Sequence, residues 1–395
     1  MKASELKKDV YWVGGIDWDI RNFHGYKTWR GTTYNSYLIV DEKITLIDTV
    51  KHYLADELLS RIKDVIDPAR IDYVIANHVE MDHTGSLSRL LEKAKNATIV
   101  TNAKGAKGIE RHYKKDWEYE IVGPDQTLRI GKRDLSFVPI PMVHWPDSMV
   151  TYDQHDKILF PNDAFGQHIA GPRRFDDEIG WSIVREEAAK YYANIVLPYS
   201  PQVKKALDAV GGLDIDMIAP SHGVIWRSYI KELLGEYEKW ATSQADPTAV
   251  VVYDSMWGST EKIAKKLLEG LEAVGIPTTL RNLKSCDISD VITDVLSAKL
   301  VAIGSPTLNN GLLPTVGEFL TYLKGLRPKE KIGFAFGSYG WGGQAVGEIE
   351  AVMKSLSWEL PEEKKNINYI PDRDEFEEVQ IIAGRLGEEV KNKCN

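Results

Sequence analysis

The chain has 395 residues, of which 43% are hydrophobic and 27% charged, and its formal net charge is −9. This composition is typical of a globular protein with two or three domains, because one hydrophobic core rarely serves more than roughly 300 residues. The N-terminus lacks a secretion signal, no apolar run is long enough to cross a membrane, and no basic run marks a nucleic-acid face. We therefore expect a cytoplasmic protein that binds small molecules or proteins.

The cysteine content limits the metal chemistry that the chain can support. Its two cysteines, Cys286 and Cys394, cannot supply the four thiolates of an iron–sulfur, rubredoxin-type or structural zinc site. Any metal must therefore be held by histidines and carboxylates.

The first part of the chain alternates apolar strand patterns with helical ones, such as the helical patterns over residues 53–66 and 86–95. The alternation ends after residue 222. A helical pattern over residues 229–242 follows, and then the segment SQADPT, which we interpret as a polar linker that ends in a helix-breaking proline. We place a domain boundary near Asp246, which gives domains of residues 1–246 and 247–395. The predicted strands of the first domain are residues 34–40, 43–50, 71–78, 97–102, 135–143, 157–163 and 215–222.

The second domain repeats a compact pattern of strand followed by helix. Strand patterns occur at residues 249–255, 299–306 and 331–340, and each is followed by a helical pattern. Strands separated by crossover helices form a parallel sheet that is covered on both faces. The sequence therefore predicts an α/β fold for this domain.

Seven potential metal ligands follow predicted strands of the first domain. A lone histidine or aspartate at a strand end is usually a cap or a hydrogen-bonded residue, but seven in matching positions favour a metal site. Four lie on one loop after residues 71–76, and three follow other strands. We expect one metal at His78, Glu80 and His144, a second at Asp82, His83 and His222, and Asp163 bridging them. Such ligands suit iron, manganese or zinc. They leave coordination positions of each metal open, which is typical of a catalytic rather than a structural metal site.

These residues resemble a known family. The HxExDH run with His144, Asp163 and His222 is similar to the metallo-β-lactamase fold, an αββα sandwich, and above all to its flavodiiron branch. Most hydrolases of that superfamily carry histidine where this chain has Glu80, and a carboxylate there favours iron over zinc. The strings GTTYNSYLIV, MVHWPDSM, PNDAFGQHI and AKYYANI also resemble flavodiiron proteins. The resemblance covers essentially the whole chain and implies two irons.

Three loops at predicted strand ends of the second domain suggest a flavin site. The first loop, residues 255–260, precedes a predicted helix and resembles the phosphate loop of flavodoxin. Hydroxyls and backbone N–H groups at a helix N-terminus bind anions. The glycines permit close backbone approach, and tryptophans offer flat faces to a ring system. This similarity implies a flavodoxin-like, doubly wound parallel sheet that binds FMN. The expected contacts are Ser255, Met256, Trp257, Gly258, Ser259 and Thr260; Ser305, Pro306, Thr307, Leu308, Asn309 and Asn310; and Ser338, Tyr339, Gly340, Trp341, Gly342 and Gly343.

The family resemblance implies that FMN passes electrons to a diiron site, which reduces dioxygen to water or nitric oxide to nitrous oxide. His24 and Tyr191 fall where the family has polar residues near the open iron positions, and we expect both to assist catalysis. His168 is expected to support a ligand rather than to be one. The resemblance also implies a head-to-tail homodimer. The chain has neither a rubredoxin-like segment nor a G-x-G-x-x-G domain, so we expect a separate electron donor, such as rubredoxin or a reduced deazaflavin.

Two other functions fit parts of the pattern. A dizinc hydrolase would use the same ligands to activate water, but Glu80 and the flavodoxin-like domain argue against it. A flavin electron-transfer protein without metals is the second alternative, and the complete set of ligand positions argues against that. Reduction of dioxygen and reduction of nitric oxide would use the same set of metal ligands, so both gases remain candidate substrates.

Overall fold

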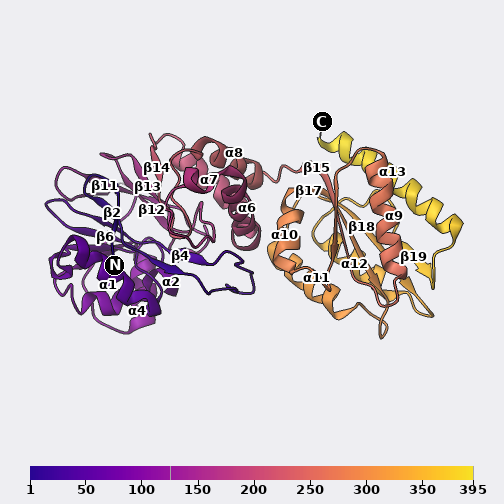
Figure 1. Cartoon of the computed structure of the whole chain (residues 1–395), viewed down its shortest axis with the longest axis horizontal. Coiled ribbons are helices and arrows are strands. Elements are labelled where there is room, and N and C mark those ends of the chain that lie inside the picture. Colours follow the sequence, from indigo (N-terminus) through magenta and orange to yellow (C-terminus); the bar gives the residue numbers. More distant parts are fainter. Residues whose placement is uncertain (125, 395) are drawn as a thin grey trace. The chain divides into compact units, whose positions relative to one another are not determined.

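The computed structural model describes residues 1–124 and 126–394 (Figure 1). The chain divides into two units. The first comprises Met1–His24, Thr28–Tyr192 and Pro201–Glu238, and the second comprises Gly25–Lys27, Ala193–Ser200 and Lys239–Asn395. Each unit is built around its own sheets. The predicted domain limit near Asp246 stays a prediction, although Asp246 is the first residue of a strand and not part of a linker.

The first unit contains two main sheets that pack face to face. One sheet has the order β1-β2-β5-β6-β7-β8-β9, and its strand pairs are antiparallel as far as β6 and parallel beyond it. The other sheet has the order β10-β11-β12-β13-β14, and its pairs are antiparallel except for β13 with β14. The strands are β1 (Ser4–Lys7), β2 (Val10–Trp12), β5 (Tyr37–Ile39), β6 (Thr45–Ile47), β7 (Tyr73–Ile75), β8 (Thr98–Thr101), β9 (Tyr119–Ile121), β10 (Thr127–Arg129), β11 (Asp134–Pro139), β12 (Met149–Asp153), β13 (Ile158–Phe160) and β14 (Met217–Ile218), and β3 (Gly15–Asp17) pairs separately with β4 (Thr32–Tyr34).

The core of this unit lies between the sheets. The rings of Tyr37 on one sheet and Phe160 on the other lie 5.2 Å apart, within a buried cluster drawn from both. Helices cover the outer faces, as expected for an αββα sandwich (Figure 1). The helices of the unit are α1 (Ala55–Val65), α2 (Met81–Thr84), α3 (Leu87–Leu91), α4 (Ala103–Tyr113), α5 (Asp176–Ile179), α6 (Trp181–Tyr191), α7 (Ser200–Val210) and α8 (Ile230–Ala241).

The second unit has a five-stranded, fully parallel sheet of order β16-β15-β17-β18-β19, the doubly wound order that the sequence predicted. Its strands are β15 (Asp246–Tyr253), β16 (Thr278–Asn282), β17 (Ala298–Pro306), β18 (Ile332–Tyr339) and β19 (Lys365–Asn368). Its helices are α9 (Ser259–Ala273), α10 (Ile288–Ser297), α11 (Pro314–Leu326), α12 (Gln344–Ser355) and α13 (Arg373–Cys394).

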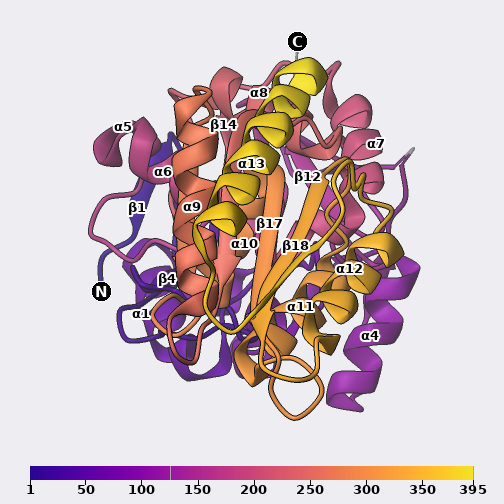
Figure 2. The same cartoon turned by 90° about the vertical axis from the view of Figure 1, so that its right-hand side faces the viewer.

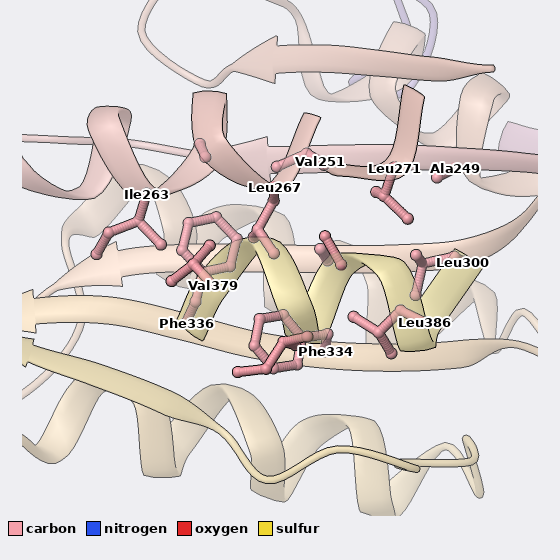
Figure 3. Close-up of a cluster of buried hydrophobic side chains, with 14 of the residues drawn as sticks. Ala249, Val251, Ile263, Leu267, Leu271, Leu300, Phe334, Phe336, Val379 and Leu386 are labelled. Atoms are coloured by element: carbon pink, nitrogen blue, oxygen red, sulfur yellow. The ribbon is translucent and has the colours of Figure 1, made fainter. Parts of the chain in front are cut away.

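Helices cover both faces of this sheet. On one face α9 and α13 lie side by side (Figure 2), and Leu267 and Val379 pack with Phe334 of the sheet (Figure 3). On the other face, a side chain at Gly337 would clash with Val346 of α12, so glycine allows that helix to approach closely. Burial on both faces explains the continuous apolar runs of the central strands.

Candidate functional site

The seven predicted ligands lie on loops that follow strands of the first unit. His78 and Glu80 follow β7, and α2 then carries Asp82 and His83; the other three follow β11, β13 and β14. The side chains form two groups, and within each group one potential ligand atom per residue lies within 4.8 Å of the others. The groups are His78, Glu80, His144 and Asp163, and Asp82, His83 and His222. This division matches the predicted one, and ligation itself stays a prediction.

Asp163 lies between the two groups. Its Oδ2 is 3.2 Å from Nε2 of His144, in the first group. Its Oδ1 is 3.0 Å from Nε2 of His83 and 3.3 Å from Nε2 of His222, in the second group. One carboxylate therefore offers one oxygen to each group, which is the geometry that a bridging ligand requires.

Several polar atoms of these groups are buried and lack hydrogen-bond partners among the described residues. They include Nε2 of His78, Nε2 of His222, both ring nitrogens of His83 and both oxygens of Asp82. Leaving one such atom unsatisfied costs about 1–3 kcal/mol, so several together need an explanation. Atoms that lie close together without hydrogen-bond geometry fit shared metal ions, which would accept their lone pairs.

The charge of the site also favours cations. Glu80, Asp82 and Asp163 bring three carboxylates into a largely buried space. Burial lowers the pKa values of His144 and His222, but the neighbouring carboxylates outweigh it and raise them to about 9 and about 10. The site therefore attracts positive charge, and histidine with carboxylate is a donor set suited to iron.

Contacts behind the histidines fix which ring nitrogen faces the site. Nδ1 of His78 lies 2.9 Å from Oδ2 of Asp147, which also accepts a 2.9 Å hydrogen bond from the backbone N–H of Val79. Nδ1 of His222 lies 2.9 Å from the carbonyl oxygen of Thr33. The Nε2 atoms are therefore free to ligate. Sequence reasoning did not single out Asp147, although it lies within the MVHWPDSM string that carried the resemblance.

His24 and Tyr191 contact the two groups as predicted for catalytic residues. Nε2 of His24 lies 3.0 Å from Oε1 of Glu80, and the side chain of His24 is 70% exposed. The hydroxyl of Tyr191 donates a 3.0 Å hydrogen bond to Oδ1 of Asp163, and burial raises the Tyr191 pKa well above its ordinary value. One residue therefore faces solvent and the other is buried, and their catalytic roles stay predictions.

His168 lies beside the second group. Its Nδ1 is 2.7 Å from Oγ1 of Thr32, and its ring centroid is 5.1 Å from that of His222 and 5.2 Å from that of Tyr191. Burial lowers the His168 pKa well below its ordinary value, so the ring is neutral at neutral pH. The contacts fit the expected supporting role, which stays a prediction.

In the second unit, the strand ends surround a pocket of about 640 Å³, a volume typical of cofactor sites. Of the predicted flavin contacts, Gly258, Thr260, Ser305, Leu308 and Gly343 lie outside its lining. Those that line it are Ser255, Met256, Trp257, Ser259, Pro306, Thr307, Asn309, Asn310, Ser338, Tyr339, Gly340, Trp341 and Gly342, and the structure adds Tyr369 and Ile370, which sequence reasoning missed.

The pocket fits a phosphorylated flavin at both of its ends. The N-terminus of α9 opens on it at Ser259, after Gly258 turns the chain with a φ of +89°. Thr260 supports this end, because its hydroxyl lies 2.9 Å from that of Ser338 near the end of β18. Trp257 and Trp341 are 92% and 93% exposed in this chain and present uncovered ring faces at the pocket.

Among the described residues, no helix is both long and apolar enough to span a membrane.

Comparisons with known proteins cover both units. Residues 32–223 match the model of the ODP family beta lactamase, and residues 251–379 match that of flavodoxin. A nitric oxide reductase of Moorella thermoacetica is 43% identical over 95% of this chain and 96% of its own length. The rubredoxin-oxygen oxidoreductase of Megalodesulfovibrio gigas is 40% identical over 100% of this chain and 99% of its own. The crystal structure of a flavodiiron protein from Giardia intestinalis superposes with a TM-score of 0.97 at 39% identity, covering 100% of this chain and 98% of that one.

Proposed function

Because this chain belongs to the flavodiiron protein family, we propose that it is an oxidoreductase that reduces dioxygen to water, nitric oxide to nitrous oxide, or both. The single observation that carries the proposal is Asp163, whose two oxygens each face one group of potential ligands. A hydrolase site needs no flavin, whereas this chain also carries a flavodoxin domain with a matching pocket.

The proposed ligands of the diiron site are the two groups described above, with Asp163 shared between them. FMN would occupy the pocket of the second unit, with its phosphate at the N-terminus of α9 and its ring system against Trp257 and Trp341. When bound, these cofactors supply stepwise electron transfer from FMN and a pair of metal ions that can hold a diatomic molecule.

The side chains around the metal groups would manage protons and position. Reduction of either gas consumes protons as well as electrons, and His24 connects Glu80 with solvent. The hydrogen bond of His24 with Glu80 raises the His24 pKa, and imidazole is the side chain whose ordinary pKa lies nearest neutral pH, which suits a proton carrier. Tyr191 instead donates from the buried side and holds Asp163 in place. We assign proton supply to His24 and orientation of the bridging carboxylate to Tyr191.

The first experiment is elemental analysis of the purified full-length protein together with its visible absorption spectrum. We expect about two irons and one FMN per chain, followed by consumption of dioxygen or nitric oxide when a reductant is supplied. Zinc without flavin would overturn the proposal and favour the dizinc hydrolase. Flavin without iron would favour the electron-transfer protein.

We also propose that electrons come from a separate protein such as rubredoxin, which appears in the name of one relative, or from a reduced deazaflavin. Gas consumption with each donor in turn distinguishes the two. The donor that supports turnover at low concentration is the physiological class, and turnover with neither would contradict both assignments.

The family resemblance further implies a head-to-tail homodimer, in which the flavin of one chain faces the metal site of its partner. Complementation tests this arrangement. An Asp163→Asn chain lacks the bridging ligand, and a Ser259→Asp chain places a carboxylate where the phosphate would bind. Co-expression of the two should restore part of the activity, because one mixed interface keeps both intact sites. Inactivity of a purified mixed dimer would contradict the head-to-tail arrangement.

A further inference from the structure

A small apolar cavity lies in the first unit, outside both sites described above. It has a volume of about 20 Å³ and lies between β12 and β13 on one side and α7 and α8 on the other. Its lining residues are Ile140, Val143, Val150, Leu159, Pro161, Ala164, Phe165, Val203, Ala206, Leu207, Val210 and Tyr237. We call it the α7 cavity.

The lining is suited to a gas and unsuited to water. Eleven of its twelve residues are apolar, and the exception, the hydroxyl of Tyr237, already accepts a 2.8 Å hydrogen bond from the backbone N–H of Phe165. A buried water needs two to four polar partners, and apolar cavities stay dry and take apolar guests such as xenon. The volume is close to the roughly 10–15 Å³ that one water-sized guest requires. A diatomic gas is therefore the size of guest that fits.

The position of the α7 cavity connects it with the metal groups. Val143 directly precedes His144, and Ala164 directly follows Asp163, so two lining residues belong to the loops that carry ligands. Both ligands are members of the first metal group. At the opposite end, Ala206 and Leu207 on α7 are only half-buried, while the other lining residues are buried. The residues that line the cavity thus include half-buried positions of α7 and residues next to the candidate ligands.

The metal groups have a second, different approach. His24 is largely exposed and contacts Glu80, so that side of the first group is polar and open to solvent. A polar approach suits protons, whereas dioxygen and nitric oxide are small and nearly apolar and partition into apolar space. The two sides of the first group therefore differ in the kind of molecule that they admit.

We propose that the α7 cavity is a docking site for a small apolar diatomic gas, from which the substrate reaches the metal groups past the loops of Val143 and Ala164 rather than past His24. The inference rests on the proposed function for the identity of the gas, but the affinity of the cavity for an apolar guest does not depend on it. Small breathing motions of the loops at Val143 and Ala164 complete the passage, since the ligand loops form its inner wall.

Xenon is the probe for the cavity. Crystals of the full-length holoprotein pressurised with xenon should show an anomalous peak among Val150, Leu159 and Val203, and Ala206→Phe should abolish it by filling the space. Ala209→Phe is the matched control, because Ala209 lies on the exposed face of the same helix. Absence of xenon from the cavity of the parent protein would overturn the proposal.

Steady-state kinetics test the route. With iron and FMN content unchanged, Ala206→Phe should lower kcat/KM for the gas several-fold and leave kcat at saturating gas unchanged, while Ala209→Phe matches the parent. Dioxygen and nitric oxide are assayed separately, and a loss for either gas identifies it as a user of the route. Equal kcat/KM values in both variants would overturn the proposal.

Two further measurements keep the test decisive. If Ala206→Phe does not fold, Ala206→Leu fills less of the space and should show a smaller loss in the same direction. Leu207→Ala widens the cavity, and it should raise xenon occupancy without lowering kcat/KM. A chain that binds xenon but consumes neither gas would overturn the proposed function alone, so the two failures are distinguishable.

Discussion

The hydroxyl of Tyr191 donates a 3.0 Å hydrogen bond to Oδ1 of Asp163 within the buried interior of the first unit. The same oxygen lies 3.0 Å from Nε2 of His83 and 3.3 Å from Nε2 of His222. Tyr191 therefore acts on the oxygen that faces the second metal group. A residue in that position can hold the carboxylate that lies between the two groups without occupying a ligand position itself.

Tyr191→Phe removes this hydrogen bond and keeps the ring. We expect iron content to stay near the parental level, because every proposed ligand remains, and gas turnover to fall about 10- to 100-fold, the scale of loss when a residue that orients a metal ligand is changed. Elemental analysis and gas-electrode rates measure the two quantities. Tyr199→Phe is the control, since its hydroxyl has no partner among the described residues. If Tyr191→Phe turned over gas at the parental rate, the Tyr191 hydroxyl would have no role in catalysis and the ring would only pack in the core.

Asp147→Asn tests the contact behind His78. Asparagine keeps the shape but removes the charge that orients the imidazole through Nδ1. Changes to such supporting carboxylates typically weaken metal binding about 10- to 100-fold, and we expect that loss for iron. Competition against a chelator measures the affinity, with the surface change Asp134→Asn as a control. Unchanged iron retention would show that His78 needs no such support.

The sequence predicted the elements that carry strong hydrophobic patterns and missed those that do not. The central strands β15, β17 and β18 are apolar runs buried on both faces, and all three were predicted. The edge strands β16 (TTLRN) and β19 (KNIN) are polar, because one edge of each is unpaired and few of their side chains enter the core, and neither was predicted. Tyr369 and Ile370 were missed for the same reason, since they follow β19.

Reading the sequence locally gave one wrong interpretation, at Pro247, and missed one residue of the site, Asp147. Pro247 suggested a linker, but β15 begins at Asp246, and the strand tolerates the proline because its pairing with β17 is irregular between Asp246 and Ala249. The two groups of candidate ligands could be anticipated because all seven residues follow strands. Asp147 could not, because a lone aspartate in a turn has no pattern that separates a ligand's partner from a cap.

Ser259→Asp tests the phosphate end of the flavin pocket. An acidic residue in the first turn of a helix interacts favourably with its dipole, so α9 should keep its stability. The same carboxylate would repel the phosphate of FMN, and we expect affinity to fall at least about tenfold, or about 1.4 kcal/mol. Flavin absorbance after desalting measures the loss, and iron content should not change. Thr321→Asp, on the exposed face of α11, is the control. Full FMN retention in Ser259→Asp would place the phosphate elsewhere.

Glu187 on α6 makes the stability of the first unit depend on pH. Its Oε1 accepts a 3.0 Å hydrogen bond from Nε of Arg30, while Oε2 is buried without a partner among the described residues. Burial raises the Glu187 pKa from 4.5 to about 7. Between these two values the folded protein retains a proton that the unfolded chain has released, so the free energy of unfolding decreases as pH rises through this window.

Glu187→Gln should remove this dependence. Because one pKa unit corresponds to about 1.4 kcal/mol, ionised Glu187 costs on the order of 3 kcal/mol above neutral pH. The variant should therefore gain stability relative to the parent between about pH 5 and about pH 8, as measured by denaturant unfolding with matched iron and FMN content. Glu186→Gln is the control, because Glu186 is exposed on the same helix. A stability difference that stays constant across this range would show that Glu187 is ionised throughout, held so by Arg30.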